Sequence, residues 1–249
     1  NKDIINIEDL PRKNDILYKI ETLTNLQLGA TLKNSGNKIF KKYNYSNLFY
    51  WAHLEAIETA EFPLHPHEGF EIMTFVLEGT VEHFDTKTNV WTKIQKDGFQ
   101  VIQSGSGVYH GERITKDSRV FQIWFDPDFS KTLKEEPSYK DYPSDFIIPK
   151  KDNKRTIYEY IGDSKVEHKT SNIKITKEIF LAGTYNIQIN KDYIYSIYTI
   201  SGLGLINSKI VKDNDFIKCE DLEYLTIDAQ NNLELFIVKT PKKLKYRTM

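Results

Sequence analysis

The sequence predicts an all-β protein in which a barrel or sandwich is duplicated along the chain, and two observations carry this prediction. Strand-forming residues dominate: the chain has 15 Tyr and 14 Phe, and Ile, Val and Thr recur in short alternating runs bounded by Gly, Asn and Asp. The two halves of the chain also share weak similarity. Many short strands with frequent turn signals are typical of sandwiches and barrels.

Individual strands are predicted from the alternation of apolar and polar residues. Helical periodicity is scarce, and the best candidate helix is the short stretch from Phe129 to Glu136. The expected strands are Leu48 to Ile57, Phe70 to Leu77, Phe99 to Gln103, Val120 to Phe125, Tyr185 to Ile189, Tyr193 to Ile200, Tyr224 to Ile227 and Leu233 to Val238.

The segment 131–153 interrupts this pattern. It is charged, carries three prolines and has no strand alternation, so we interpret it as a connector between an N-terminal barrel, residues 1–130, and a C-terminal barrel, residues 154–249. The flanking halves look distantly alike, because TFVLEGTVEHFD from Thr74 matches IYTISGLGLINS from Ile197. In each half a strand runs into a glycine turn and out again, which favours a duplicated barrel.

Charge and cysteine content restrict the class of protein. A net charge of -1 gives no general attraction to nucleic acid or to an anionic membrane, and no apolar run approaches the ~18 residues that a membrane helix needs. The single cysteine, Cys219, cannot form an internal disulfide, which fits a reducing compartment. No signal-peptide pattern is visible, and the first residue is Asn1, so the original start is expected to be missing or processed. We expect a cytoplasmic protein.

Two short motifs predict a metal site. In His65-Pro66-His67 the residues i and i+2 of an extended strand point to the same face, so both imidazoles can converge on one point. His110-Gly111-Glu112 repeats this geometry with an imidazole and a carboxylate, after a turn rich in glycine. A lone His-x-His is more often a surface or core pair, but two matching pairs favour four ligands around one ion. Three imidazoles and a carboxylate suit Fe, Mn, Co, Ni, Cu or Zn.

Three other polar residues have competing interpretations. Glu71 has the strand parity of His65 and His67, so it is either a further ligand or, as we favour, a hydrogen-bond partner that orients a ligand imidazole. His53 is expected to be a packed histidine and His83 to bond to nearby backbone or to Asp85, although either could line the pocket. Five of the six histidines precede position 111, so the metal chemistry is expected in the first half.

The run HPHEGFEIMTFVLEGTVEHFD, followed by SGSGVYHGE and VFQIWF, resembles the pirin family, most strongly from about Phe62 to Asp126. The resemblance implies two cupin barrels packed face to face, with a metal in the N-terminal barrel and a C-terminal barrel that has lost its ligands. It implies one divalent transition metal, most often Fe(II), and a Glu71 that is not a ligand. By motif position the implied ligands are His65, His67, His110 and Glu112.

The same resemblance implies a function. Some pirins act as quercetin 2,3-dioxygenases, which open a flavonol ring with O₂, so the expected partners are a small aromatic substrate and O₂. Glu112 is the expected catalytic residue, because a carboxylate beside the metal lies within reach of a coordinated hydroxyl. Met73 and Phe75 are expected either to line the apolar cavity or to pack in the core. We also expect a monomer.

Two alternatives to the flavonol dioxygenase stay open. Other pirins are redox-responsive regulators that bind a transcription factor or a metabolic enzyme without catalysis, and this chain offers no partner motif that decides the matter. A cupin with a structural metal, or with another enolisable substrate, would have the same ligands.

Overall fold

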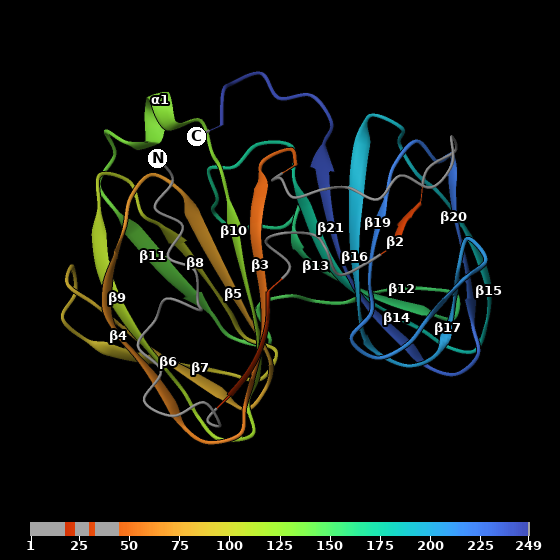
Figure 1. Ribbon diagram of the computed structural model, residues 1–249, viewed down its shortest axis with the longest axis horizontal. Helices are drawn as coiled ribbons and strands as arrows, with labels where there is room; N and C mark the ends of the chain where they lie inside the picture. Colours follow the sequence, from red (N-terminus) through yellow and green to blue (C-terminus); the bar gives the residue numbers. More distant parts are fainter. Residues whose placement is uncertain (1–17, 23–29, 33–44, 249) are drawn as a thin grey trace.

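Two β units lie side by side in the protein (Figure 1). The computed structural model describes residues 18–22, 30–32 and 45–248, and for the first two of these ranges it describes the backbone. Each unit consists of two sheets that enclose an apolar interior. The expectation of an all-β chain built from two barrels is confirmed.

The first barrel combines a six-stranded and a four-stranded sheet. The six-stranded sheet has the order β1 (Tyr18–Thr22), β3 (Leu48–Ala56), β10 (Arg119–Phe125), β5 (Glu71–Glu78), β8 (Phe99–Gln103), β11 (Ser138–Tyr142). The four-stranded sheet has the order β4 (Ala60–His67), β9 (Val108–Ile114), β6 (Thr80–Asp85), β7 (Trp91–Gln95). All pairs in both sheets are antiparallel.

The second barrel repeats this plan with a seven-stranded and a four-stranded sheet. The seven-stranded sheet has the order β12 (Lys150–Asp152), β13 (Arg155–Ile161), β14 (Lys174–Phe180), β21 (Leu233–Pro241), β16 (Tyr193–Ser201), β19 (Phe216–Cys219), β2 (Ala30–Leu32). The four-stranded sheet has the order β15 (Gly183–Gln188), β20 (Tyr224–Ala229), β17 (Gly204–Ile206), β18 (Lys209–Val211).

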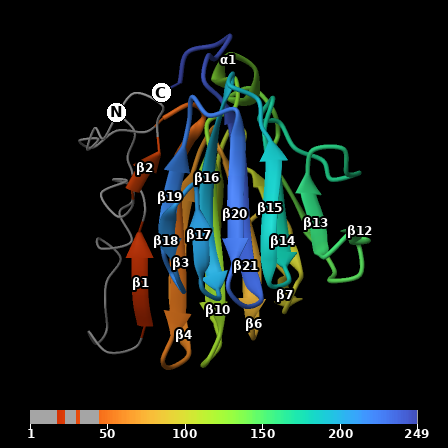
Figure 2. The same cartoon turned by 90° about the vertical axis from the view of Figure 1, so that its right-hand side faces the viewer.

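The chain does not divide between the barrels as simply as the expected boundaries suggest. β2, from the N-terminal region, pairs in parallel with β19 of the second barrel, and Figure 2 shows β1 and β2 following one another along one side of the molecule. The segment 131–153 contributes β11 to the first barrel and β12 to the second. The predicted helix is shorter than expected, since α1 covers Phe129–Thr132 and begins where the side chain of Asp128 accepts a hydrogen bond from Ser130 N.

The largest apolar cluster lies between the barrels. Sheet strands that are covered on both faces have nearly continuous apolar sequences, as in β3 (LFYWAHLEA) and β5 (EIMTFVLE). Their outward faces meet the seven-stranded sheet, and the ring of Phe236 lies 5.0 Å from those of Phe75 and Phe121. Trp51 packs against Phe236 in the same cluster.

The interior of the second barrel is filled by apolar side chains. Phe180, Ile217, Ile227 and Leu235 belong to a cluster contributed by both of its sheets, and the buried thiol of Cys219 lies among them. By contrast, the interior of the first barrel is apolar at one end, around Val81. At the other end it holds the polar groups described next. Among the described residues, no helix is long and apolar enough to span a membrane.

Candidate metal centre

Three imidazoles converge inside the first barrel. His65 and His67 come from β4 and His110 from β9, and His65 lies directly opposite His110 in the antiparallel pair. Their candidate ligand atoms all lie within 4.8 Å of one another. The ring centroid of His110 is 4.4 Å from that of His65 and 4.7 Å from that of His67. This spacing is compatible with three nitrogens bound to one ion.

The local sequence explains why both β4 histidines point inward. β4 is the edge of its sheet, and Pro66, which has no N–H to donate, occupies the position between the two histidines. Residues i and i+2 share a face of the strand, so Pro66 points outward and is exposed while His67 is buried. A register shift between Phe62 and His65 sets the final alignment with β9.

The ring nitrogens of these histidines are arranged as in a metal site. His65 Nδ1 lies 2.8 Å from the carbonyl oxygen of Pro63, which fixes the proton on Nδ1 and leaves Nε2 free. His67 Nε2 and both ring nitrogens of His110 are buried without a hydrogen-bond partner among the described residues. Such a group costs about 1–3 kcal/mol when it stays unsatisfied, so the site fits an ion better than it fits ordinary core packing.

Burial keeps these imidazoles in the form that binds metals. Loss of hydration lowers the pKa of His67 well below its usual value, and the nearby His65 lowers it further. The pKa of His110 is also lowered, first by burial and then by His67, His65 and His83. Both rings are therefore neutral and have a lone pair to donate.

Glu112 lies beside this group and is held by side chains of the opposite sheet. Both of its carboxylate oxygens accept from Gln122 Nε2, at 2.9 and 3.0 Å, and Gln122 Oε1 accepts from Trp124 Nε1 at 3.1 Å. Glu112 belongs with His83 and His110 to a second set of potential ligand atoms within 4.8 Å of one another. The two sets share His110. The three predicted histidine ligands therefore lie together, whereas Glu112 adjoins them only through His110 and is grouped with His83.

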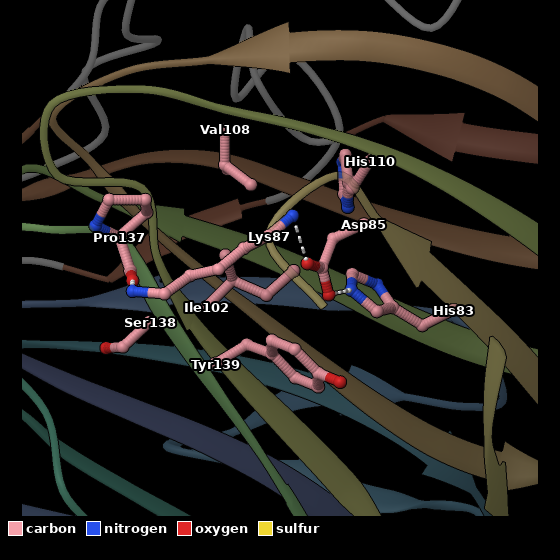
Figure 3. A pocket seen from close by; sticks show the side chains of 9 residues that line it. All are labelled: His83, Asp85, Lys87, Ile102, Val108, His110, Pro137, Ser138 and Tyr139. Carbon is pink, nitrogen blue, oxygen red and sulfur yellow. Dashed lines mark hydrogen bonds and ion pairs between the residues drawn. The ribbon is translucent and has the colours of Figure 1, made fainter. Parts of the chain in front are cut away.

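His83 and Asp85 extend the polar group along β6. His83 faces Glu112 across the strand pair and Asp85 faces His110. His83 Nε2 lies 3.2 Å from Asp85 Oδ2, as expected from the sequence. Both residues line a small cavity with His110 (Figure 3). The complete lining is His83, Asp85, Lys87, Ile102, Val108, His110, Pro137, Ser138 and Tyr139.

Aromatic side chains close the barrel around the histidines. The ring of Trp124 lies 5.1 Å from that of His67 and stacks at 4.1 Å on Tyr50. The hydroxyl of Tyr50 is buried without a partner among the described residues, and burial, followed by the charge of Glu112, raises its pKa. Tyr50 therefore stays protonated and can donate to a ligand.

Glu71, Met73 and Phe75 do not reach this site. They lie on the other face of β5, where Met73 and Phe75 are part of the core between the barrels. The carboxylate of Glu71 accepts hydrogen bonds from Lys169 N and Thr170 N at 2.7 and 2.6 Å. Of the two alternatives for Met73 and Phe75, core packing is therefore the one that holds. The expectation that Glu71 orients a ligand imidazole is wrong, because strand parity does not continue through the turn at Gly69, which separates β4 from a strand of the other sheet.

The remaining histidines have structural partners. His53 is buried between the barrels and its Nδ1 lies 2.8 Å from the hydroxyl of Tyr198, so it is packed as expected. His168 Nδ1 lies 2.8 Å from the carbonyl oxygen of Thr170.

The sequence did not predict three residues of the site, Gln122, Trp124 and Tyr50. Nothing in their strands shows which face turns toward the histidines until the order of the strands in the sheets is known.

Solved structures with the same fold define the class of this protein. GK1651 from Geobacillus kaustophilus matches with a TM-score of 0.70 and 23% identity, over 92% of this chain and 98% of that chain. The bacterial pirin YhhW from Escherichia coli, solved in complex with nickel(II), matches with a TM-score of 0.69 and 19% identity, over 90% and 100%. The chain is a bicupin, with two cupin barrels in one polypeptide.

Sequence comparison assigns the family within this class. The pirin family model matches residues 19–125. A pirin-like protein of Caulobacter vibrioides is 27% identical over 202 residues, which is 78% of this chain and 84% of that protein. A quercetin 2,3-dioxygenase of Escherichia coli K12 is 38% identical over 78 residues, covering 30% of this chain and 33% of that enzyme. Over residues 19–125 the chain matches the pirin family, and its fold is that of the solved pirins.

Proposed function

We propose that this protein binds one divalent transition metal, preferentially Fe(II), through His65, His67, His110 and Glu112. The observation that carries the proposal is the set of buried ring nitrogens that have no hydrogen-bond partner among the described residues and converge within 4.8 Å. The similarity to a bacterial pirin that was solved with nickel(II) supports it.

The proposed reaction is the oxidative opening of a flavonol such as quercetin by O₂, as the similarity to a quercetin 2,3-dioxygenase suggests. A bound metal ion supplies a Lewis acid for the substrate oxygen and a redox partner for O₂. Glu112 accepts the proton of the substrate hydroxyl, because its carboxylate keeps free lone pairs beyond those used by Gln122. Tyr50 and Trp124 exclude water from the same chamber.

The decisive experiment loads the protein anaerobically with Fe(II) and measures O₂ uptake with quercetin. Uptake well above that of free Fe(II), lost in Glu112→Ala and His65→Ala, is the expected result. His168→Ala serves as the matched control, because His168 lies in the second barrel and is bonded to Thr170. Uptake no faster than with free Fe(II) would contradict the dioxygenase proposal, and full metal occupancy in His65→Ala would contradict the ligand assignment.

A redox-responsive regulator is the second candidate, and one observation favours it. The residues that alternate with the histidines on β4 and β9 form an exposed surface, with Leu64 51% and Tyr109 53% exposed. A change in the oxidation state of the metal would therefore act on histidines whose immediate neighbours in the chain lie on the outer surface. Metal binding without O₂ uptake, together with partner binding that differs between the Fe(II) and Fe(III) forms, would support this candidate.

A further inference from the structure

His83 lies at the metal centre without a place among the four proposed ligands. It is 1% exposed, and it is the cross-strand neighbour of Glu112. A ligand atom of His83 lies within 4.8 Å of those of His110 and Glu112, whereas His65 and His67 are outside this set. The small cavity in Figure 3 is lined by both His83 and His110, so His83 borders the same space as a proposed ligand.

Asp85 determines which ring nitrogen of His83 carries the proton. Its Oδ1 accepts from Lys87 N and Thr88 N, both at 2.8 Å, and its Oδ2 accepts from Thr88 Oγ1 at 3.1 Å. A carboxylate with these donors can only accept from His83 Nε2, which lies 3.2 Å from Oδ2. Asp85 therefore holds a proton on His83 Nε2, and Nδ1 faces away from this carboxylate as the ring's acceptor position.

Nδ1 of His83 is buried and has no partner among the described residues. The cavity that His83 lines has the apolar side chains of Ile102 and Val108 as well as polar ones, and the ring of Tyr139 lies 4.9 Å from that of His83. We propose that, as a flavonol binds, its 3-hydroxyl donates a hydrogen bond to His83 Nδ1 before that proton passes to Glu112, and that His83 thereby selects ligands that carry this hydroxyl. This proposal rests on the proposed function, and it assigns to His83 the recognition of the substrate hydroxyl.

The test measures ligand binding, not turnover. Quercetin and luteolin, which lacks the 3-hydroxyl, are titrated anaerobically into the Ni(II)-loaded protein, and quenching of tryptophan fluorescence gives both dissociation constants. In His83→Phe, which keeps a ring but removes the acceptor, quercetin should bind about tenfold more weakly, while luteolin should change by less than about twofold. His53→Phe, at a buried histidine outside the cavity, should leave both constants unchanged.

A second variant keeps the shape of the site and changes only the proton. In Asp85→Asn the amide oxygen must take the place of Oδ1, which receives two backbone N–H groups, so the amide NH₂ faces His83 Nε2. His83 then carries its proton on Nδ1 and cannot accept. The same selective loss of quercetin binding is expected, at an unchanged Ni(II) content.

Each other outcome has a definite meaning. If the wild type does not bind quercetin more tightly than luteolin, the proposed function fails. If the wild type discriminates but both variants retain that discrimination, His83 is not the acceptor. Equal weakening of both ligands would indicate a damaged cavity, and loss of Ni(II) from His83→Phe would make His83 a metal ligand. Either result would overturn the inference.

Discussion

The buried ring nitrogens of His67 and His110 have consequences for both metal binding and stability. A buried ring nitrogen that has no hydrogen-bond partner among the described residues destabilises the metal-free fold. An ion that binds only the folded state restores that stability by mass action. The same histidine nitrogens that are proposed to bind the metal therefore lower the stability of the metal-free protein.

Replacement of His110 by a similarly sized apolar residue tests this opposition. We expect His110→Leu to abolish metal binding and to raise the free energy of unfolding in the presence of chelator by about 1–3 kcal/mol. Urea unfolding with EDTA and metal analysis of the purified protein check both parts. His168→Leu, at a half-buried histidine with a backbone partner, should do neither. A less stable His110→Leu protein in EDTA would show that the nitrogens have partners in solution.

Gln122 determines where the carboxylate of Glu112 lies. Gln122→Met keeps the volume but removes the donor to Glu112 and the acceptor for Trp124. Metal affinity is expected to fall about 10–100-fold, as for other residues that orient a ligand, without loss of the fold. Competition with a chromophoric chelator measures it. The control is Gln100→Met, because Gln100 is equally buried but donates to Asp141. An unchanged metal affinity in Gln122→Met would mean that the hydrogen bond from Gln122 does not position Glu112 for metal binding.

At the scale of the element, Glu71 joins the start of β5 to the loop that precedes β14. Burial raises the pKa of its carboxyl group, whereas hydrogen bonds from Thr170 and Lys169 lower it. These donors make Glu71 the main polar link described between β5 and the second barrel. Its role is structural, and it lies four residues beyond a proposed ligand.

Glu71→Gln should lower the free energy of unfolding by about 1–3 kcal/mol. The amide has one acceptor oxygen, so its NH₂ group must face one of the two backbone N–H donors, which is left buried and unpaired. Chemical denaturation measures the loss. Glu68→Gln, in the exposed turn before Gly69, is the matched control and should be neutral. A neutral Glu71→Gln would contradict the described link.

The strands were largely predictable from sequence, and their arrangement in sheets was not. Alternation located β3, β8 and β16 to within a residue or two, because side chains on a strand must match a buried and an exposed face. Parity also paired His65 with His67 and His110 with Glu112. It failed at Glu71, since a turn resets which face points inward, and it could not place Gln122, which approaches the site from the opposite sheet.

At the scale of the whole molecule, the core between the barrels makes them one folding unit. Trp51 contacts Tyr198, Phe216 and Phe236 of the second barrel. The C-terminal segment also returns to the first barrel, where the hydroxyl of Tyr246 donates to the carbonyl oxygen of Asp126 at 2.7 Å. Neither barrel can lose its structure without exposing this shared surface.

Trp51→Ala should therefore lower the free energy of unfolding by about 3–5 kcal/mol, the range for a large buried aromatic residue. It should also separate the unfolding of the two barrels, seen as different midpoints for near-UV circular dichroism and for thiol exposure of buried Cys219. Trp91→Ala, at a 43% exposed tryptophan stacked on Arg113, should cost less than about 1 kcal/mol. Coincident midpoints in Trp51→Ala would show that other contacts keep the barrels coupled.

The position of β4 at the edge of its sheet gives the proposed metal a second effect. An ion held by His65 and His67 on the edge strand and by His110 on its neighbour would cross-link the two strands, in the manner of a clasp. An open strand edge is where chains pair with one another and aggregate, and Pro63 and Pro66 only partly blunt this one. The supply of metal would then determine the rate at which the protein aggregates as well as its chemistry. Amide hydrogen exchange in β4 should be fastest when the ion is removed.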